Sequence, residues 1–393
     1  MPELPEVESN RRLLSKIIVG KEIKLVLPEE TGGGPRDGLF DNIVLEPQSM
    51  RSSSLVKQEL EGATCVSLQR RGKQMWWNLT RKGRPSIALL FHFGMTGALV
   101  VKGVGSNLYK NFKVDRSTWP PKFTKMQAHF SDGTEVAFVD PRRLGRIRIR
   151  EDPLNSPPIS LLAPDALEEL PSPEDFTKAL TKYSAPIKAV LLDQNKIVAG
   201  VGNYIVDECL YQSRIHPEAS SKVVGASKPD AFLLREKLLE VCRVASDCNS
   251  NLEDFPSHWL FHNKWKRKGV SNQMNGKSIK YSTVGGRTTA HVPGHQRKTF
   301  GVEGEEHIEV EIKEETKSEE SDSSDAHIAT GGTKPKKRTP IRRKVDAGLE
   351  VKPEVATEQT QARKGKRSRT SQVVSAKEEG TGRRRLPRLA KKA

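Results

Sequence analysis

The first residues of the chain offer an unusual nucleophile. Pro2 follows Met1, and a small second residue usually permits removal of Met1, which would leave a proline with a free ring nitrogen. The pKa of such an amine lies near about 8, whereas that of lysine lies near about 10.4, so a fraction of the proline is neutral at pH 7. A secondary amine that attacks a sugar carbon forms a cationic iminium, which is an electron sink. Covalent chemistry at Pro2, once Met1 has been removed, is therefore one of two interpretations of these residues.

The same residues also suit an ordinary helix start. Pro5 fits the first turn, where no N–H is needed, and the three glutamates among residues 3–8 complement the positive end of a helix dipole. Apolar residues then recur at helical spacing: Leu4, Val7, Leu14 and Ile18. This pattern predicts a helix to about Ile18, ended by Gly20.

The composition points to a polyanionic partner. The 393 residues carry a formal net charge of +17, which favours nucleic acid or an anionic membrane surface. The longest apolar stretch, near residues 87–93, is too short to span a bilayer and no signal peptide opens the chain, so we expect an intracellular protein without membrane association. The four cysteines form no CxxC pair and are expected to be buried thiols.

The order of patterns predicts an α+β fold. Short alternating apolar runs between residues 21 and 150, including the segments 41–47 and 63–70, indicate an antiparallel β-sandwich after the N-terminal helix. We place this domain at 2–152, a helical DNA-binding domain at 153–262, a hairpin at 263–300 and a disordered acidic and basic tail at 301–393. The segments 29–37 and 102–122 look like inserted loops.

The helical half contains one glycine-rich turn that could bind an anion. Gly-Val-Gly-Asn, residues 200–203, stands just before a predicted helix that Asn203 would cap. Several backbone N–H groups at the positive end of that helix would form a cradle for phosphate. A glycine-rich turn alone is weak evidence, but here helices flank it and Lys196 lies nearby.

A series of motifs resembles the formamidopyrimidine-DNA glycosylase family. In chain order they are PELPEVE at 2–8, RRGK at 70–73, HFGMTG at 92–97, DPRRLG at 140–145, GVGNYIVDE at 200–208 and GGRTTAHVPGHQ at 285–296. The resemblance covers residues 2 to 297. It implies a helix–two-turn–helix motif around residues 200–208.

The resemblance assigns the reacting groups to the N-terminus and one lysine. Pro2 is then the nucleophile, Glu3 the acid, and Lys73 the lysine that contacts the DNA and the lesion. Glu6 is expected to be structural, holding the helix start or Lys73. On the residues alone, the RRGK segment is equally a strand start whose tryptophans face the core.

Two further motifs would fill the space left by a displaced base. The resemblance implies that Met95 enters the duplex and that Arg142 pairs with the orphaned base, while Arg143 takes a phosphate. Leu144 stands where the family has an aromatic wedge, so it keeps the apolar contact and loses stacking. The alternatives are a core position for Met95 and an ion pair with Asp140 for either arginine.

The helix–two-turn–helix motif would hold the DNA backbone. The resemblance places Lys196, Gly202 and Asn203 on phosphates, and Glu208 at the lesion pocket or buried beneath it. One departure from the family is the order Asn-Tyr-Ile at 203–205 in place of Asn-Ile-Tyr.

The hairpin parallels a zinc finger without its ligands. The cysteine positions of the family hold Val292 and His295 here, and the upstream pair near residues 271–274 is missing as well. We therefore predict a zincless hairpin, no metal and no other cofactor, with Arg287 presented to a phosphate.

Together these features predict a bifunctional DNA glycosylase and abasic-site lyase that removes oxidised, ring-opened purines by β,δ-elimination. The partner would be double-stranded DNA with an oxidised base or an abasic site, bound by a monomer in the nucleus, to which the basic tail would direct it. The alternatives are an endonuclease VIII-type glycosylase for oxidised pyrimidines, which Leu4 argues against because that branch usually has glycine there, and a non-catalytic nucleic-acid-binding protein. We expect ring-opened purines, hydantoins and abasic sites to be preferred over 8-oxoguanine, because the segment 248–275 is short for a lesion-covering loop.

Overall fold

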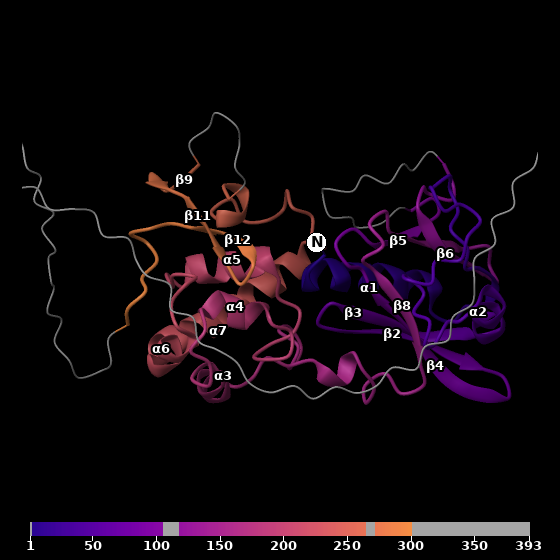
Figure 1. Ribbon diagram of the computed structural model, residues 1–393, viewed down its shortest axis with the longest axis horizontal. Coiled ribbons are helices and arrows are strands. Elements are labelled where there is room, and N and C mark those ends of the chain that lie inside the picture. Colours follow the sequence, from indigo (N-terminus) through magenta and orange to yellow (C-terminus); the bar gives the residue numbers. More distant parts are fainter. Residues whose placement is uncertain (1, 105–117, 265–271, 301–393) are drawn as a thin grey trace, which may run out of the picture. The chain divides into compact units, whose positions relative to one another are not determined.

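Strands β1 to β8 form two antiparallel sheets, as the alternating residues predicted (Figure 1). The structure is a computed structural model, which describes residues 2–104, 118–264 and 272–300. All of the described residues belong to one unit, Met1–Ile312; the second unit, Lys313–Ala393, lies outside them. The predicted tail at 301–393 and most of the predicted loop at 102–122 also lie outside the described residues.

The two sheets have four strands each. One has the order β1-β6-β7-β5, with β1 Ile23–Leu27, β5 Ala98–Val101, β6 Thr124–Phe130 and β7 Glu135–Val139. The other has the order β2-β3-β4-β8, with β2 Thr64–Arg71, β3 Gln74–Arg81, β4 Arg84–His92 and β8 Arg146–Arg150.

Aromatic rings join the sheets through one hydrophobic core. The Trp77 ring of β3 lies 6.0 Å from the Phe130 ring of β6, and the Phe91 ring of β4 lies 5.8 Å from the Phe138 ring of β7. Burying such side chains contributes about 1.5–3 kcal/mol each relative to leaving them exposed. The predicted sandwich is therefore confirmed.

Two local predictions in this half were wrong. The segment 41–47, predicted as a strand, forms turns with a single bridge from Leu45 to Ile147, because the carboxylate of Asp41 accepts the backbone N–H groups of Ile43 and Val44. The helix α2, Ser53–Leu60, was not predicted; Ser52 begins it by accepting the N–H of Leu55.

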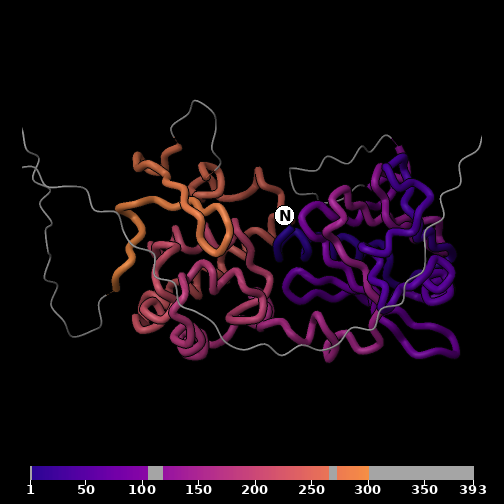
Figure 2. The backbone as a smooth tube through the Cα atoms, in the orientation of Figure 1, coloured from indigo at the N-terminus to yellow at the C-terminus, as the bar shows by residue number. Residues whose placement is uncertain are grey.

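The N-terminal helix α1, Leu4–Ile18, has the predicted bounds. The predicted apolar face, Leu4, Val7, Leu14 and Ile18, is buried. Figure 2 traces this segment between the strands and the helical half, and α1 contacts both β2 and the last long helix, α7. The N-terminus therefore lies where the two halves of this unit meet.

Helices build the second half around their own core. Their bounds are α3 Pro173–Leu180, α4 Ile187–Leu192, α5 Asn203–Gln212, α6 Ser221–Ala226 and α7 Lys228–Asp247, with short 3-10 turns η1 Ile159–Leu161 and η2 Leu260–His262. Ser172 caps α3 by accepting the N–H of Asp175, and Pro173 fills its first position. The helix α6 was not predicted, because its six residues carry too few turns for a clear period.

The predicted hairpin is present and shares a small apolar core with α5 and η2. Strands β11, Lys280–Val284, and β12, Arg287–His291, pair around the turn Gly285–Gly286, where both glycines have positive φ. Two shorter strands, β9 Gln273–Met274 and β10 Lys277–Ser278, pair beside them. The residues that pack together are Tyr211, Leu260, Met274, Ile279, Ala290 and Val292.

Candidate active site

The first residues after Met1 are buried against the glycine-rich turn that precedes α5. Pro2 and Glu3 are both buried, and the backbone N–H of Leu4 donates to the carbonyl of Gly200 at 3.0 Å. A Cβ on Gly202 would lie 2.2 Å from the Glu3 Cδ, so only glycine leaves room for this carboxylate. The close approach of the two segments therefore explains Gly202 without a phosphate.

The carboxylate of Glu3 occupies the N-terminus of α5. Its Oε1 accepts the N–H of Tyr204 at 3.0 Å, and its Oε2 accepts that of Ile205 at 3.3 Å. The prediction that Asn203 caps this helix was wrong: Gly202 is the N-cap residue, and the carboxylate of Glu3 accepts the N–H groups that a capping side chain would otherwise bind. Asn203 is instead the first helical residue, and its amide donates to the Thr288 carbonyl at 3.0 Å.

This arrangement changes the acidity of Glu3. Burial raises its pKa above the ordinary value of a glutamate, while Lys73 and the N–H groups of Tyr204 and Ile205 oppose that rise. The net direction is upward. Glu3 can therefore hold a proton more readily than an exposed glutamate can, as a general acid must.

Glu6 lies directly behind Glu3. Its Oε2 accepts the backbone N–H of Glu3 at 2.8 Å, and its Oε1 accepts the hydroxyl of Tyr204 at 3.1 Å. Burial, followed by the charge of Glu3, raises the pKa of Glu6 to about 7. The sequence did not assign a role to Tyr204; the only signal was the Asn-Tyr-Ile order, which puts the phenol on this carboxylate.

Lys73 belongs to the same electrostatic cluster from the side of the sheet. It lies at the turn between β2 and β3, where Gly72 has φ +58° and packs against Ala199. Burial lowers the pKa of Lys73, which the carboxylate of Glu3 opposes and the guanidinium of Arg287 reinforces. The exposed Arg287, at the start of β12, thus acts on Lys73 electrostatically from the hairpin.

The two loops predicted to fill the duplex lie against each other. A Cβ on Gly94 would lie 2.4 Å from the Leu144 carbonyl carbon, and the Thr96 hydroxyl donates to the Asp140 Oδ1 at 2.7 Å. Met95 is half-buried, whereas Arg142 and Leu144 are exposed. The structure thus brings these three predicted residues to adjacent loop tips.

Arg143 has a different partner from those that the sequence suggested. Its guanidinium donates to both carboxylate oxygens of Asp41, at 2.7 and 2.9 Å. Asp140 instead accepts the backbone N–H groups of Arg142 and Gly145. The alternative ion pair with Asp140 is therefore not formed by Arg143, whose partner comes from the segment 41–47, predicted above as a strand.

Lys196 and Glu208 have local partners. Lys196 pairs with Asp193 at 3.1 Å and lies 5.2 Å from the Tyr183 ring. Glu208 is buried and accepts the N–H groups of Leu260 and Phe261 at 3.2 and 2.9 Å, at the start of η2. Of its two predicted places, the buried one is therefore the one observed.

A buried charge network joins α5 to the hairpin. Asp207 accepts from Lys188 at 2.6 Å and from Lys264 at 2.8 Å, and its carboxylate also lies 3.5 Å from the backbone nitrogen of Ala290 in β12. Lys188 reaches the Thr288 carbonyl at 3.4 Å. This network could not be predicted from the sequence, because a lysine and an aspartate on separate helices look like ordinary surface residues.

The hairpin positions that hold cysteine in zinc fingers are packed. Val292 belongs to the hairpin core, and the His295 ring lies 4.7 Å from that of Tyr211. The His291 ring contacts that of His216 at 4.6 Å. In the described part of the chain, no group of three histidines, cysteines or acidic residues could hold a metal ion.

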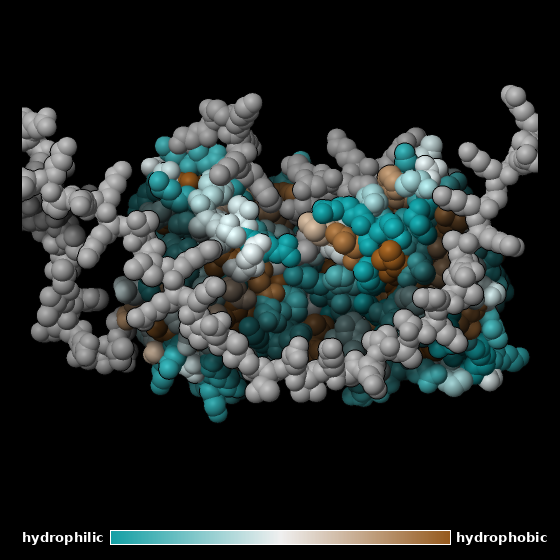
Figure 3. All heavy atoms as spheres, in the orientation of Figure 1, coloured by the Kyte–Doolittle hydropathy of each residue, from teal (hydrophilic) through white to brown (hydrophobic). Residues whose placement is uncertain are grey.

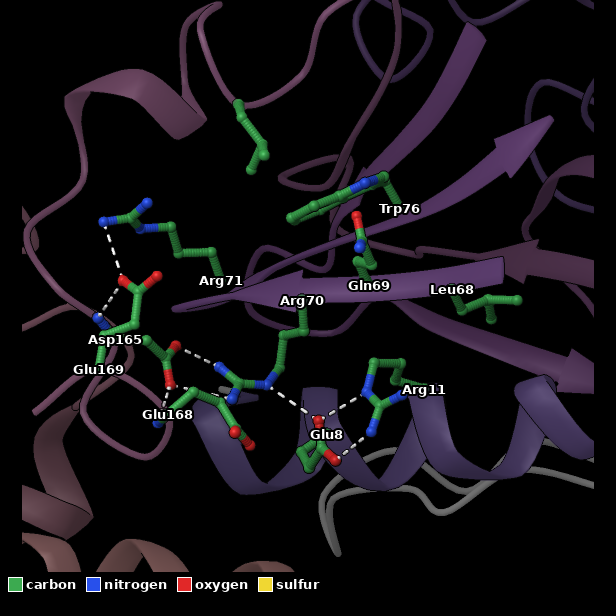
Figure 4. A pocket seen from close by; sticks show the side chains of 11 residues that line it. Glu8, Arg11, Leu68, Gln69, Arg70, Arg71, Trp76, Asp165, Glu168 and Glu169 are labelled. Carbon is green, nitrogen blue, oxygen red and sulfur yellow. Dashed lines mark hydrogen bonds and ion pairs between the residues drawn. The ribbon is translucent and has the colours of Figure 1, made fainter. Parts of the chain in front are cut away.

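A separate cavity of about 410 Å³ lies among charged residues of α1, β2 and the segment 165–169 (Figure 4). Arg70 donates to Glu8 at 3.1 Å and pairs with Asp165, which also accepts the N–H of Gly72 at 2.6 Å. None of the predicted site residues lines this cavity. Its charges serve to fix the β2–β3 turn, and so Lys73, to the helical half.

Comparison with known proteins identifies the family. Residues 1–147 match the formamidopyrimidine-DNA glycosylase N-terminal domain and residues 162–251 match its H2TH domain. The formamidopyrimidine-DNA glycosylase of Arabidopsis thaliana is 38% identical over 314 residues, which span 79% of this chain and 74% of that relative. The enzyme of the same name from Halalkalibacterium halodurans is 29% identical over 299 residues, 74% of this chain and 97% of the relative.

Solved structures agree with this assignment. A MutM protein in complex with DNA containing carbocyclic 8-oxo-G is 25% identical, with a TM-score of 0.58 over 76% of this chain and 100% of that one. The Lactococcus lactis protein bound to DNA containing FAPY-dG is 25% identical, with a TM-score of 0.57 over 75% and 100%. The fold and site define a protein with the architecture of a DNA glycosylase. The chain belongs to the formamidopyrimidine-DNA glycosylase family.

Proposed function

We propose that this protein is a bifunctional DNA glycosylase and abasic-site lyase that removes oxidised, ring-opened purines in base excision repair. The names of its relatives support this class of substrate, and none of the relatives compared above is named for oxidised pyrimidines. The observation that carries the proposal is the position of Glu3. Its carboxylate is buried beside Pro2, bound by the N-terminus of α5, and has a raised pKa.

The chemistry begins at the two terminal residues. After removal of Met1, the Pro2 nitrogen attacks the C1′ carbon of the damaged nucleotide while Glu3 protonates the ring oxygen, so the sugar opens and the base leaves. The resulting iminium acidifies the C2′ protons. Loss of one such proton expels the 3′ phosphate, a second elimination expels the 5′ phosphate, and a one-nucleotide gap remains.

The cluster around Glu3 prepares these steps. Lys73, whose pKa burial lowers, lies in the same electrostatic cluster and contacts the lesion. Glu6 holds the backbone N–H of Glu3 and thereby fixes the peptide that follows Pro2. General acid–base groups in such positions contribute about 10²–10⁴-fold to a rate.

The adjacent loops stabilise the opened duplex. Turning a nucleotide out of the stack costs a few kcal/mol, which a damaged base lowers. Met95 and Leu144 fill the space that the base leaves, and Arg142 pairs with the base opposite. Their exposed or half-buried positions at adjacent loop tips are consistent with these roles.

The DNA itself is held by charge. Hydrophilic residues cover much of the face seen in Figure 3, and hydrophobic ones form separate groups on it. Arg287, Asn203 and Lys196 contact phosphates in this proposal, and affinity falls steeply with salt. The protein acts as a monomer in the nucleus, directed there by basic clusters of the tail, which lies outside the described residues.

A panel of lesions tests the proposal. Duplexes with a formamidopyrimidine, a hydantoin, 8-oxoguanine or an oxidised pyrimidine are incubated separately with the unmodified, Met-processed protein. We expect fastest excision of the ring-opened purines and hydantoins. This ranking rests on the segment 248–275, of which residues 265–271 lie outside the described part of the chain. Faster excision of the oxidised pyrimidine would favour an endonuclease VIII-type specificity instead.

A further inference from the structure

The loop that carries Arg142 and Leu144 is anchored at its centre by an ion pair that the reaction does not use. We propose that Asp41 and Arg143 are positioning residues that hold residues 140–145 in place and thereby set how strongly the enzyme discriminates between bases opposite the lesion. This inference rests on the proposed function, which gives Arg142 the role of contacting that base.

The ion pair has the geometry of a firm contact. The guanidinium of Arg143 donates through Nε and one terminal nitrogen to the two oxygens of Asp41, at 2.7 and 2.9 Å. Such paired, charge-assisted hydrogen bonds fix orientation as well as distance. The Asp41 side chain is fully buried, whereas that of Arg143 is 30% exposed.

Asp41 is itself held from several sides. It accepts the N–H groups of Ile43 and Val44, and Lys125 of β6 lies 3.5 Å from its carboxylate. Lys125 also pairs with the buried Glu30. Burial alone would raise the pKa of Asp41, but the hydrogen bond from Arg143 and the other partners lower it to about 2. The carboxylate is therefore charged at neutral pH and fixed to the sheet.

The backbone of the loop depends on this contact. Arg143 has φ +54°, a left-handed conformation that non-glycine residues rarely adopt without support. Asp140 binds the N–H groups of Arg142 and Gly145, so it ties two points of the loop, and Asp41 ties the residue between them. Because the Arg143 side chain turns to Asp41, its neighbours Arg142 and Leu144 are left at the exposed tip.

The same contact argues against the phosphate role first expected for Arg143. Two of its donors already bind a buried carboxylate. A phosphate could use them only if Asp41 lost this partner inside the protein. Arg143 is therefore committed first to holding the loop, and a phosphate contact would have to use its remaining donors.

The test compares Asp41→Asn, Arg143→Gln and the double variant with the parent protein. A matched control is Asp37→Asn, an exposed aspartate of the same segment that accepts only the Gly33 N–H among the contacts observed. Equilibrium binding is measured on duplexes that carry a stable abasic analogue opposite each of the four bases, at several salt concentrations. Borohydride trapping on natural abasic DNA is measured in parallel.

We expect both single variants to reduce the ratio of affinities between the best and worst opposite base by about fivefold or more, the lower range of a specific base contact. The double variant should lose no more than either single one, because both changes break the same pair. The salt dependence of Arg143→Gln should match that of the parent protein, and Asp41→Asn should still be trapped.

The opposite pattern would overturn the inference. If Arg143→Gln lowers the slope of log affinity against log salt by about one and weakens all four duplexes equally, while Asp41→Asn changes neither, Arg143 is a phosphate ligand. If Asp41→Asn does not fold, Arg143→Gln alone decides, because Asp41 then keeps Lys125 and Arg36 as charged partners. Absence of trapping by the parent protein would contradict the proposed function. The ratios of affinity between opposite bases would still test whether the Asp41–Arg143 pair positions the loop.

Discussion

The carboxylate of Glu3 accepts the backbone N–H of Tyr204 at 3.0 Å, although 201 residues separate the two in the chain. The contact places the proposed acid on the positive end of α5, which favours a charged carboxylate, in a buried position, which favours a neutral one. Burial outweighs the helix, so the pKa of Glu3 is raised. The helix thus orients the acid, and the burial keeps its proton available.

Gly202→Ala separates two roles of the glycine-rich turn. The new Cβ would lie 2.2 Å from the Glu3 Cδ and displace the carboxylate, and since Gly202 has φ −133° the backbone itself tolerates alanine. We expect base removal in single-turnover assays to fall about 10²-fold or more, with DNA affinity changed less than about threefold. If affinity falls instead and the excision rate of bound DNA is kept, the turn serves mainly as a phosphate cradle.

The raised pKa of Glu6 predicts that the stability of the folded protein depends on pH. Its pKa is raised to about 7 in the folded protein from 4.5, so its stabilising effect is complete below about pH 4.5 and is lost as pH rises through about 7. The free energy of unfolding, measured in urea, should therefore fall more between pH 5 and pH 8 in the parent protein than in Glu6→Gln. Equal changes in both proteins would contradict this assignment.

Tyr204→Phe provides the matched variant for Glu6. The phenol hydroxyl donates to Glu6 and lowers its pKa, so its removal should move the pH-dependent loss of stability to higher pH. It also leaves a buried acceptor with one partner fewer, which costs about 1–3 kcal/mol when the carboxylate is charged. The destabilisation should thus be larger at pH 8 than at pH 5.

Asp207 should contribute strongly to the free energy of unfolding, although nothing in the surrounding sequence marks it. Asp207→Asn removes the charge that compensates the buried Lys188, and breaking such a pair costs about 3–5 kcal/mol. Asp193→Asn, which breaks the half-exposed pair with Lys196, should cost less than about 1 kcal/mol. Denaturant titration of both variants compares them, and similar small losses would show that the network does not anchor the hairpin.

A chelator should leave the protein unaffected. The hairpin is held by an apolar core that it shares with α5 and η2 and by contacts of Asp207 and Asn203 with β12. We expect excision rate and melting temperature to be the same in the presence and absence of a strong zinc chelator. A loss of activity of more than a few-fold would mean that the protein needs a bound metal ion.

Regular periodicity made much of the fold predictable. The bounds of α1, the alternating strands and the hairpin around Gly285 and Gly286 all follow from local sequence. The prediction of a strand at 41–47 was wrong because the side chain of Asp41 binds nearby backbone N–H groups, which outweighs the apolar pattern of the segment. The short helices α2 and α6 lack the proline that marks the start of α3 and α4, and their six to eight residues carry too little periodicity to be recognised without it.

The candidate site was predictable as a set of residues but not as a set of contacts. Motifs named Glu3 and Gly202 separately, and only the folded chain shows that one makes room for the other. The partnership of Arg143 with Asp41 was beyond reach for the same reason, since the two lie 102 residues apart. The only sign of a role for Tyr204 was the order Asn-Tyr-Ile at 203–205 in place of Asn-Ile-Tyr.

The most direct test of the central claim is borohydride trapping on abasic DNA followed by peptide mapping. The untagged, Met-processed protein should give a covalent adduct at Pro2, and Pro2→Gly or a blocked N-terminus should abolish it. Glu3→Gln should still be trapped on abasic DNA, where no base has to leave, but not on a duplex with an intact lesion. If no adduct forms, or if the adduct maps to Lys73, the terminal amine is not the nucleophile.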